Sequence, residues 1–567
     1  MKDRIRSFEY WGFALFLLIL LGAPVDAAQA NDQKQEKTTS LERQIHDYEK
    51  LSPFEFKNTL IDIAKKSKAA DLLNAGRGNP NFLNTTVREA HALIEKFGSE
   101  AAKEKIAVND LGLRLDKEGL AEKFKLYLST QNAEDSGVQF LYKALQYAEE
   151  DLKFNADEFV FELVDNILGD FYPSPPRISI LTGQVVNAYL AKVLLQGNVP
   201  PDTTFDLFAT EGATAAMVYT FKSLNENMVI KKGDKIAILT PIFSPYLEIP
   251  ALNDYELVQV HVESDEKLGW QVPDSEAEKL LDKNIKALFL VNPTNPTSVS
   301  LSKETVNKIA HIVKTKRQDL IVLTDTVYAT FVNDYYTLLQ AIPENTICVY
   351  SYSKYFGVTG WRLGVIMLSE NNVIDAYIKK LPDADKRLLA KRYAIDAVDP
   401  AGIKFIDRLL MDSRDVALAH TGGISGPQQG MMCLLSLFEL IDTEGVYKKS
   451  IRSILYKRIK NLYAHLGIDP AAGENKTHYY ALLNLKTIAE KKYGAEFSRH
   501  FDSEDMIYKF LLALAKEKAV VCLPGKGFSG PTSSIRVSLA NLNDDDYTAI
   551  SKAIDFIMKK FHQELEA

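Results

Sequence analysis

The chain has 567 residues, of which 46% are hydrophobic and 25% are charged, and this composition excludes a fibrous, collagen-like or wholly disordered protein. Its 67 basic and 75 acidic residues give a net charge of −8, which disfavours nucleic acid and anionic lipid surfaces as partners. The three cysteines are widely spaced and form no CxxC pair, so the sequence predicts neither a disulfide framework nor a metal site.

The N-terminus has the pattern of a secretory signal peptide. A basic start, Lys2 to Arg6, precedes a 13-residue apolar stretch, Trp11 to Ala23, and a small-x-small motif, Ala28-Gln29-Ala30. We therefore predict that this segment directs export, with the periplasm as the expected location. The alternative is an uncleaved membrane anchor over Tyr10 to Val25, although a spanning helix needs ~20 apolar residues.

Beyond residue 50, short apolar runs rich in β-branched residues alternate with longer helical patterns. Five near-continuous apolar runs are predicted to be strands that are buried on both faces. They are Lys235–Thr240, Ala287–Val291, Leu320–Thr324, Ile347–Ser351 and Leu363–Leu368. Polar, helix-favouring stretches such as Lys303–Arg317 separate them. This order predicts an α/β fold with a mostly parallel central sheet.

Two further stretches, 94–170 and 375–420, carry apolar residues at helical spacing without a strand pattern, and they are predicted to be helical insertions. From Val446 the pattern becomes mixed α+β, which predicts a smaller closing domain. The resulting division is a signal peptide (1–30), a linker and the start of a helix (31–50), an N-terminal segment of the small domain (51–93), a helical insertion (94–170), a large domain (171–374), a helical insertion with an inter-domain helix (375–445) and the C-terminal small domain (446–567).

Polar residues follow the predicted strands at the points where open α/β sheets bind ligands. Asn292–Thr297 follows the second run, Asp325 and Tyr328 follow the third, and Ser351–Lys354 follows the fourth, with Arg362 eight residues after Lys354. Because the carboxyl ends of parallel strands lie at one edge of a sheet, we expect these side chains to converge. Taken alone, each residue also has a non-functional interpretation, such as a helix cap for Asp325 or a solvated loop residue for Lys354.

These motifs resemble those of the fold type I pyridoxal-phosphate enzymes, the aspartate aminotransferase superfamily. The resemblance rests on the S-x-S-K-x7-R spacing from Ser351 to Arg362, on N-P-x-N-P-T ending at Thr297, and on the D-x-x-Y that begins at Asp325. It implies a fold type I transferase with a large cofactor-binding domain, a smaller α+β domain and pyridoxal 5′-phosphate as the cofactor. The family often has glycine after N-P-T, where this chain has Ser298, and we expect this difference to alter only the turn.

The resemblance also implies roles around the cofactor ring. Lys354 would bind the cofactor's aldehyde covalently and, as a free amine, move the proton of the substrate's α-carbon. Asp325 would lie against the pyridine nitrogen, which a negative charge keeps protonated. Asn295 and Tyr328 would donate hydrogen bonds to the ring's 3′ oxygen.

The cofactor phosphate needs positive charge and hydrogen-bond donors. The predicted helix Ala215–Leu224 follows Thr210-Glu211-Gly212-Ala213-Thr214, so backbone amides at a helix N-terminus are expected to face the phosphate. The expected phosphate ligands are Gly212, Ala213, Thr214, Ser351, Ser353 and Arg362.

Two aromatic positions have open interpretations. Phe243 is expected to stack on the cofactor ring, with Tyr246 as the alternative and an ordinary loop aromatic as the non-functional reading. Tyr172 matches a family tyrosine that reaches the phosphate of the neighbouring subunit. That match implies a homodimer with shared active sites, alone or within a larger oligomer of dimers, and the other reading of Tyr172 is a buried turn tyrosine.

Substrate recognition is assigned by the same resemblance. Arg536 would bind the α-carboxylate through its planar fork, beside Asn295, and Gly78 would let the backbone approach the substrate closely. Arg77 is a candidate for the second carboxylate, with a surface salt bridge as the alternative. Aspartate aminotransferases clamp that carboxylate with a partner-subunit arginine, and His420–Pro427, the comparable stretch here, contains none. Weak clamping favours loss of the carboxylate as CO2, because a tight ion pair would stabilise the ground state.

Within the superfamily the chain is most similar to the aspartate 4-decarboxylases, through Asn74–Asn84, Ser351–Gly364 and Ile535–Asn541. This similarity implies decarboxylation of L-aspartate at its β-carboxylate to L-alanine and CO2, with aspartate aminotransferase as a side activity. An aminotransferase for dicarboxylic or aromatic amino acids is the enzymatic alternative. A non-enzymatic ligand-sensing module is disfavoured. Such proteins carry a basic helix-turn-helix segment, and neither the signal-like N-terminus nor the net charge of −8 fits one.

Overall fold

The computed structural model describes residues 45–67, 70–106, 108–252, 255–414, 419–470 and 473–566. The predicted signal peptide, 1–30, lies outside these residues. The chain divides into two compact units, Met1–Lys50 and Leu51–Ala567, and the description below concerns the second unit. In the described part of the chain, no helix combines the length and the apolar character needed to cross a membrane.

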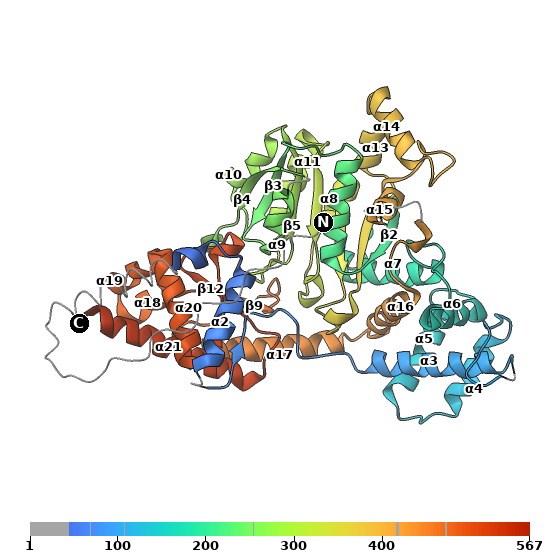
Figure 1. The fold of residues 1–567 in the computed structure, drawn as a ribbon, viewed down its shortest axis with the longest axis horizontal. Coiled ribbons are helices and arrows are strands. Elements are labelled where there is room, and N and C mark those ends of the chain that lie inside the picture. The colour runs from blue at the N-terminus through green and yellow to red at the C-terminus, as the bar shows by residue number, and fades with distance from the viewer. Residues whose placement is uncertain are drawn as a thin grey trace, which may run out of the picture. The chain divides into compact units, whose positions relative to one another are not determined.

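A seven-stranded sheet organises this unit (Figure 1). In spatial order its strands are β2 (Phe205–Thr210), β8 (Gly364–Ser369), β7 (Thr346–Ser351), β6 (Ile321–Asp325), β5 (Ile285–Val291), β3 (Lys235–Thr240) and β4 (Val258–Glu263). The strands from β7 to β4 are parallel, whereas β8 pairs antiparallel with both β2 and β7. The predicted α/β fold with a mostly parallel sheet is confirmed.

All five predicted strands are present, and the two that the sequence pattern does not predict, β2 and β4, occupy the two edges of the sheet. In β4 the sequence VQVHVE alternates apolar and polar residues, and most of its side chains are partly or fully exposed. In β2 the strand opens with two half-buried residues, Phe205 and Asp206. An edge strand is covered less completely than a central one, so its sequence lacks the continuous apolar run that identifies the others.

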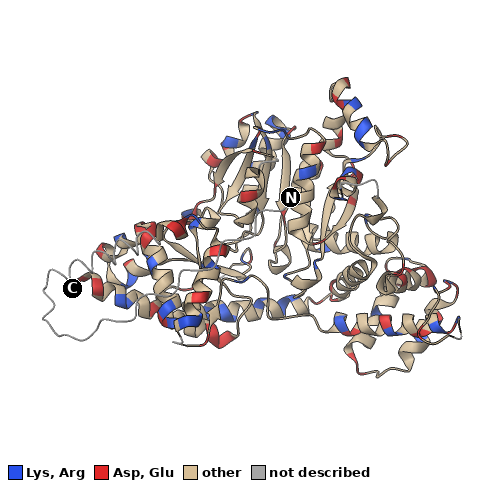
Figure 2. Ribbon diagram, in the orientation of Figure 1, with Lys and Arg blue, Asp and Glu red and all other residues tan. Residues whose placement is uncertain are grey.

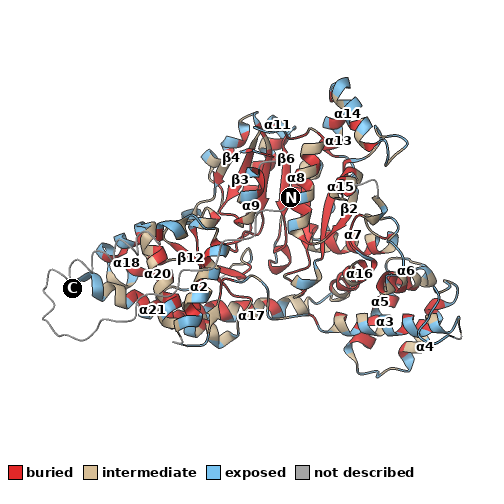
Figure 3. Cartoon of the chain, viewed as in Figure 1, coloured by how far each residue is buried: buried red, intermediate tan, exposed pale blue. Residues whose placement is uncertain are grey.

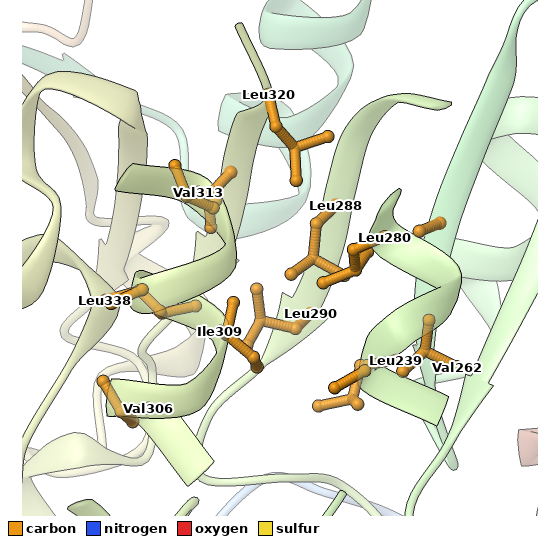
Figure 4. Packing of buried hydrophobic residues seen from close by; sticks show 14 of the residues in the cluster. Leu239, Val262, Leu280, Leu288, Leu290, Val306, Ile309, Val313, Leu320 and Leu338 are labelled. Atoms are coloured by element: carbon orange, nitrogen blue, oxygen red, sulfur yellow. The ribbon is translucent and has the colours of Figure 1, made fainter. Parts of the chain in front are cut away.

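Helices cover both faces of the sheet. Among them are α7 (Ile180–Leu195), α8 (Ala213–Glu226) and α11 (Lys303–Lys316). Leu288 of β5 packs with Ile309 of α11 in an apolar cluster (Figure 4). The next residue, Phe289, points to the opposite face, because successive side chains of a strand alternate, and its ring centre lies 5.5 Å from that of Phe221 of α8. The central strands are therefore buried on both faces (Figure 3).

Helices occupy both stretches that the sequence predicts to be helical, and their status as insertions stays a prediction. The first begins within α3 (Thr86–Lys103) and contains α4 (Leu120–Ser129), α5 (Ser136–Glu150) and α6 (Ala156–Leu168). The second begins within α13 (Val373–Lys379) and contains α14 (Asp383–Tyr393) and α15 (Phe405–Arg414). Helix α16 (Gly426–Ile441) packs against α3, α5, α6 and α7, so the first insertion is joined to the helical layer of the central sheet.

Helix α17 (Val446–Tyr463) leads into a smaller group of elements. Its members are a three-stranded sheet of β11 (Leu523–Pro524), β12 (Ser534–Ser538) and β9 (Tyr480–Asn484), and the helices α18 (Leu485–Tyr493), α19 (Ala495–Ser498), α20 (Glu504–Lys518) and α21 (Asp544–Glu566).

The N-terminal elements join this group, since α2 (Pro53–Ser67) packs on α20 and β1 (Leu73–Asn74) pairs with β10 (Val520–Val521). The exact domain boundaries stay a prediction. Figure 2 shows both signs of charge spread over the outer helices and far fewer charges on the central strands.

Candidate active site

A cavity of about 310 Å³ opens where β5, β6 and β7 end, and residues of β9 and β12 close its other side. Its lining includes twelve residues that the sequence predicts for the site. They are Gly78, Ala213, Thr214, Phe243, Asn295, Asp325, Tyr328, Ser351, Ser353, Lys354, Arg362 and Arg536. Strand ends that are far apart in sequence thus bring their polar residues to one place, as expected for parallel strands.

Three predicted site residues do not line this cavity. Gly212 lies behind its wall, against Arg362. Arg77 is exposed, and its side chain takes no part in the cavity of this chain. Tyr172 is 66% exposed, with its ring edge-on to that of His420, so its interpretation as a buried turn tyrosine is wrong. Its interpretation as a residue that serves a neighbouring subunit stays a prediction.

The Lys354 ammonium lies in the cavity wall and donates a hydrogen bond to the Gly78 carbonyl at 3.2 Å. Burial, and to a smaller extent the positive charges of Arg536 and Arg362, lower the pKa of Lys354 to about 8, while the charge of Asp325 opposes the shift. A lysine with this pKa is partly neutral near physiological pH. The neutral amine is the form that attacks carbonyl groups and accepts protons.

Asp325 ends β6 and is 4% exposed. One carboxylate oxygen, Oδ2, accepts a hydrogen bond from the Tyr246 hydroxyl at 2.7 Å, and Oδ1 accepts one from the Val327 N–H at 2.9 Å. Burial raises the pKa of Asp325 to about 6, against the effect of these two hydrogen bonds and of the Lys354 charge. A buried carboxylate of this kind is stabilised by a cationic or N–H group placed against it.

The two candidates for ring stacking, Phe243 and Tyr246, differ in their contacts and exposure. Tyr246 is 1% exposed and its hydroxyl is occupied by the carboxylate. Phe243 is half-buried, lines the cavity and meets the rings of Tyr246 and Phe54 edge-on, with ring centres 5.2 and 5.8 Å away. Tyr246 lines the cavity as well, so the assignment of ring stacking to Phe243 stays a prediction.

A cradle for an anion lies at the start of α8, where no side chain caps the helix. Gly212 has a φ of +92°, and a Cβ at this position would lie 2.4 Å from Nη2 of Arg362. The Gly212 N–H donates to the Thr210 carbonyl at 2.8 Å, so the expectation that it faces the phosphate is wrong. Because Gly212 has no side chain, it leaves space for the guanidinium of Arg362. Ala213 and Thr214 line the cavity.

The remaining predicted phosphate ligands surround this cradle. Arg362 donates to the carbonyls of Thr359 and Glu211, at 2.9 and 3.1 Å. The hydroxyls of Ser351 and Ser353 are hydrogen-bonded to each other at 2.9 Å. A guanidinium and two hydroxyls therefore lie together beside a helix N-terminus, which is the donor set that a phosphate group requires.

Arg536 of β12 is only 1% exposed, yet no carboxylate pairs with it among the residues that the structure describes. Its Nη1 donates to Oδ1 of Asn295 at 3.2 Å and its Nη2 to the Gly76 carbonyl at 2.8 Å, whereas Nε has no partner within the described ranges. A buried guanidinium without a counter-ion is costly. An anionic ligand would supply the missing charge.

The stretch His420–Pro427 contains no arginine. An arginine of α15, Arg414, contacts it. Arg414 donates to the carbonyls of Thr421 and Gly423, at 3.2 and 2.8 Å, and forms an ion pair with Glu211 at 2.9 Å. The guanidinium of Arg414 is therefore already committed within its own chain.

Sequence reasoning missed Tyr480, Phe54 and Thr359, which also line the cavity. An aromatic residue at the start of a strand has the pattern of a core residue, so no local signal identifies Tyr480. The expectation that Ser298 alters only the turn is also wrong. Ser298 has a φ of +61°, and its hydroxyl accepts a hydrogen bond from the Tyr480 N–H at 2.8 Å. The left-handed conformation costs a non-glycine residue ~1–2 kcal/mol, which this bond offsets in part.

Comparison with known proteins agrees with this geometry. The family model described as "Aminotransferase class I and II" matches residues 187–554. A bifunctional aspartate aminotransferase and L-aspartate beta-decarboxylase of a Pseudomonas species is 42% identical over 521 residues, which cover 91% of this chain and 97% of that protein. An aspartate aminotransferase of Sulfurisphaera tokodaii is 25% identical over 364 residues, which cover 62% of this chain and 75% of that one.

Solved structures add a likeness of fold. The aromatic aminotransferase of Pyrococcus horikoshii OT3 superposes with a TM-score of 0.54 at 18% sequence identity, covering 88% of this chain and 99% of that chain. At this level of identity the comparison concerns the fold alone.

Proposed function

Because the chain belongs to the aminotransferase class I and II family, we propose that it removes the β-carboxylate of L-aspartate as CO2, releases L-alanine, and transaminates aspartate as a second activity. It is a pyridoxal 5′-phosphate-dependent enzyme that acts on amino acids. The observation that carries the proposal is the grouping of Lys354, Asp325 and Arg536 in one cavity of about 310 Å³.

The residues of the cavity fit the cofactor. The uncapped start of α8, with Arg362 beside it, would hold the phosphate, and Gly212 leaves the space that this guanidinium occupies. Asp325 would pair with the pyridine nitrogen, and Phe243 would stack on the ring. When bound, pyridoxal 5′-phosphate withdraws electrons from the bonds at the amino acid's α-carbon and, after a proton shift, from those at its β-carbon.

Lys354 is placed to hold the cofactor and then to act as the base. Since its pKa is about 8, its amine can take the proton from the substrate's α-carbon near neutral pH. The Gly78 carbonyl, 3.2 Å from Nζ, fixes the direction of the side chain. Asp325 would stabilise positive charge on the pyridine nitrogen and so favour the same proton transfer.

Arg536 would bind the α-carboxylate. Its Nη1 and Nη2 are oriented by Asn295 and the Gly76 carbonyl, and its Nε has no partner in the described structure. A fixed planar fork orients a carboxylate in two directions at once, which lysine cannot do.

The β-carboxylate meets a different environment. The stretch His420–Pro427 supplies no arginine, and the nearby Arg414 is held by Glu211. Arg77, the sequence candidate for this carboxylate, is exposed and outside the cavity of its own chain. Weak pairing raises the energy of the carboxylate relative to the departing CO2, which favours decarboxylation over simple transamination.

The test is to incubate the purified protein and pyridoxal 5′-phosphate with L-aspartate, with and without a 2-oxo acid that accepts the amino group, and to measure CO2, alanine and oxaloacetate. We expect alanine and CO2 in equal amounts and a smaller amount of oxaloacetate, with Lys354→Ala as the inactive control. Oxaloacetate without alanine would replace the decarboxylase by an aminotransferase, and no product from any amino acid would refute both.

We also propose that residues 1–30 direct export to the periplasm, on the basis of their charge and hydropathy pattern. Cell fractionation and N-terminal sequencing of the mature protein test this proposal. An intact N-terminus in the membrane fraction would support the uncleaved anchor instead.

A further inference from the structure

Tyr480, the first residue of β9, faces the same cavity as Lys354 and is 3% exposed. Its hydroxyl lies 2.9 Å from that of Tyr328, which follows β6 in the central sheet. Tyr328 is the residue that the family resemblance assigns to the cofactor's 3′ oxygen. A second phenol therefore contacts the first from the opposite side of the cavity.

The ring of Tyr480 is in contact with the substrate side of the cavity as well. The guanidinium carbon of Arg536 lies 4.5 Å from the centre of this ring and 4.8 Å from that of Phe528. Cation–π contact fixes the plane of a guanidinium that has no carboxylate partner. The ring of Tyr480 thus orients the fork that would receive the α-carboxylate.

The hydroxyl and the amine of the reacting lysine both lie beside Gly78. A Cβ built on Gly78 would lie 2.6 Å from the Tyr480 hydroxyl and 3.6 Å from Nζ of Lys354. A side chain at Gly78 would force the Tyr480 hydroxyl to move. Gly78 therefore leaves the space in which this hydroxyl lies.

Ser298 holds Tyr480 in this position. Its hydroxyl accepts the Tyr480 N–H at 2.8 Å, and its carbonyl accepts the Thr477 N–H at 2.9 Å. A glycine at position 298 would keep the second bond and lose the first. The N-P-T loop that presents Asn295 is in this way tied to the strand that presents Tyr480.

We propose that Tyr480 is a positioning residue that couples the cofactor side of the site, through Tyr328, to the substrate side, through Arg536, and that Ser298 sets its place. The proposal rests on the proposed function. For Tyr328 to donate its proton to the 3′ oxygen, Tyr480 must donate to Tyr328, and this donation makes Tyr328 a stronger donor.

Both phenols keep their protons at neutral pH. Burial raises the pKa of Tyr328 well above its ordinary value, and it raises that of Tyr480 although the charge of Arg536 opposes the shift. The titratable and charged groups around the pair are Lys354, Asp325, Arg536, Tyr479, Tyr246 and Cys522.

The test is the pH titration of the visible absorption of the lysine-bound cofactor, with aspartate KM as a second readout. A donor to the 3′ oxygen favours the deprotonated form of the bound chromophore. Tyr480→Phe removes the hydroxyl and keeps the ring, so we expect the absorption midpoint to rise by about half a pH unit while KM changes less than about twofold. Tyr480→Leu also removes the ring, so KM should rise by about tenfold or more.

Ser298→Gly should shift the midpoint and KM in the same directions by smaller amounts, because only the main-chain anchor is lost. Tyr189→Phe is the matched control. It breaks another buried phenol pair, Tyr189 with Tyr350 at 2.5 Å, outside the cavity, and it should leave both readouts at the wild-type values.

A wild-type midpoint in Tyr480→Phe, or an equal shift in Tyr189→Phe, would overturn the inference and leave the proposed function intact. A wild-type protein that develops no visible absorption with pyridoxal 5′-phosphate would overturn the proposed function instead.

Discussion

Lys354 should capture the cofactor at a rate that rises with pH through about 8, the value to which burial and two neighbouring arginines lower its pKa. The neutral amine is the nucleophile, so its fraction controls the rate. Mixing the cofactor-free protein with pyridoxal 5′-phosphate and following the visible absorption that borohydride abolishes measures this rate.

Arg536→Gln removes one of the charges that lower this pKa, so the rate profile should move to higher pH. Lys354→Ala should show no borohydride-sensitive absorption at any pH. A wild-type rate that is flat between about pH 7 and about pH 9 would contradict the assignment of the titrating group to Lys354.

Asp325→Asn should retain the cofactor and lose most of the activity. The amide has almost the same shape and can still contact Tyr246 and Val327, but it brings no negative charge to the ring nitrogen. We expect kcat to fall on the order of 10³-fold, since stabilisation of developing charge contributes several kcal/mol. Steady-state kinetics and cofactor titration measure the two effects separately.

Tyr246→Phe is the companion variant for Asp325. It deletes one of the hydrogen bonds that hold the pKa of Asp325 down, so this pKa should rise above about 6. The acidic limb of the activity profile should move to higher pH, with a loss in kcat of about tenfold or less. Near-normal turnover in Asp325→Asn would remove this carboxylate from its role.

At the scale of elements, the start of α8 depends on a glycine. In Gly212→Ala the added methyl would meet Arg362, 2.4 Å away from Nη2, and the residue would be held at a φ of +92°. The guanidinium must move away from the helix N-terminus. We expect the Kd for pyridoxal 5′-phosphate to rise by about tenfold to about a hundredfold, measured by fluorescence titration.

Gly233→Ala is the control that separates the effect of backbone strain from the effect of displacing Arg362. Gly233 also has a positive φ, +85°, but a Cβ there meets nothing within 4 Å. Both variants should lower Tm, and only Gly212→Ala should weaken the cofactor. Equal weakening in both would show that backbone strain, and not the displacement of Arg362, is responsible.

At the scale of the whole molecule, two subunits should complete one site. Tyr172 is 66% exposed and lies outside the cavity of its own chain. If it serves the neighbouring subunit, Tyr172→Ala and Lys354→Ala should each be nearly inactive alone. A hybrid of the two, purified through two different tags, should regain activity, because the chain that keeps Lys354 receives Tyr172 from its partner.

The hybrid should show about half of the wild-type activity per dimer, from one restored site of two. Size-exclusion chromatography with light scattering confirms that the hybrid is assembled. A hybrid as inactive as its parents would mean that Tyr172 does not act across an interface.

The sequence by itself determined the central strands and the residues at their ends. Each of β3, β5, β6, β7 and β8 is buried on both faces, so its apolar run is continuous and visible without a structure. Parallel strands end at one edge, and for this reason Asn295, Asp325 and Lys354 could be placed together before any contact was known.

Only the tertiary structure decided the edges of the sheet and the partners of the site. The edge strands β2 and β4 carry weaker patterns because one side of each is uncovered. Tyr480 lies 152 residues from Tyr328 in the chain, and Tyr246 lies 79 residues from Asp325. Hydrophobic patterns report how a segment is buried, whereas a bond between distant hydroxyls and carboxylates depends on how the packed segments are oriented, which no local pattern records.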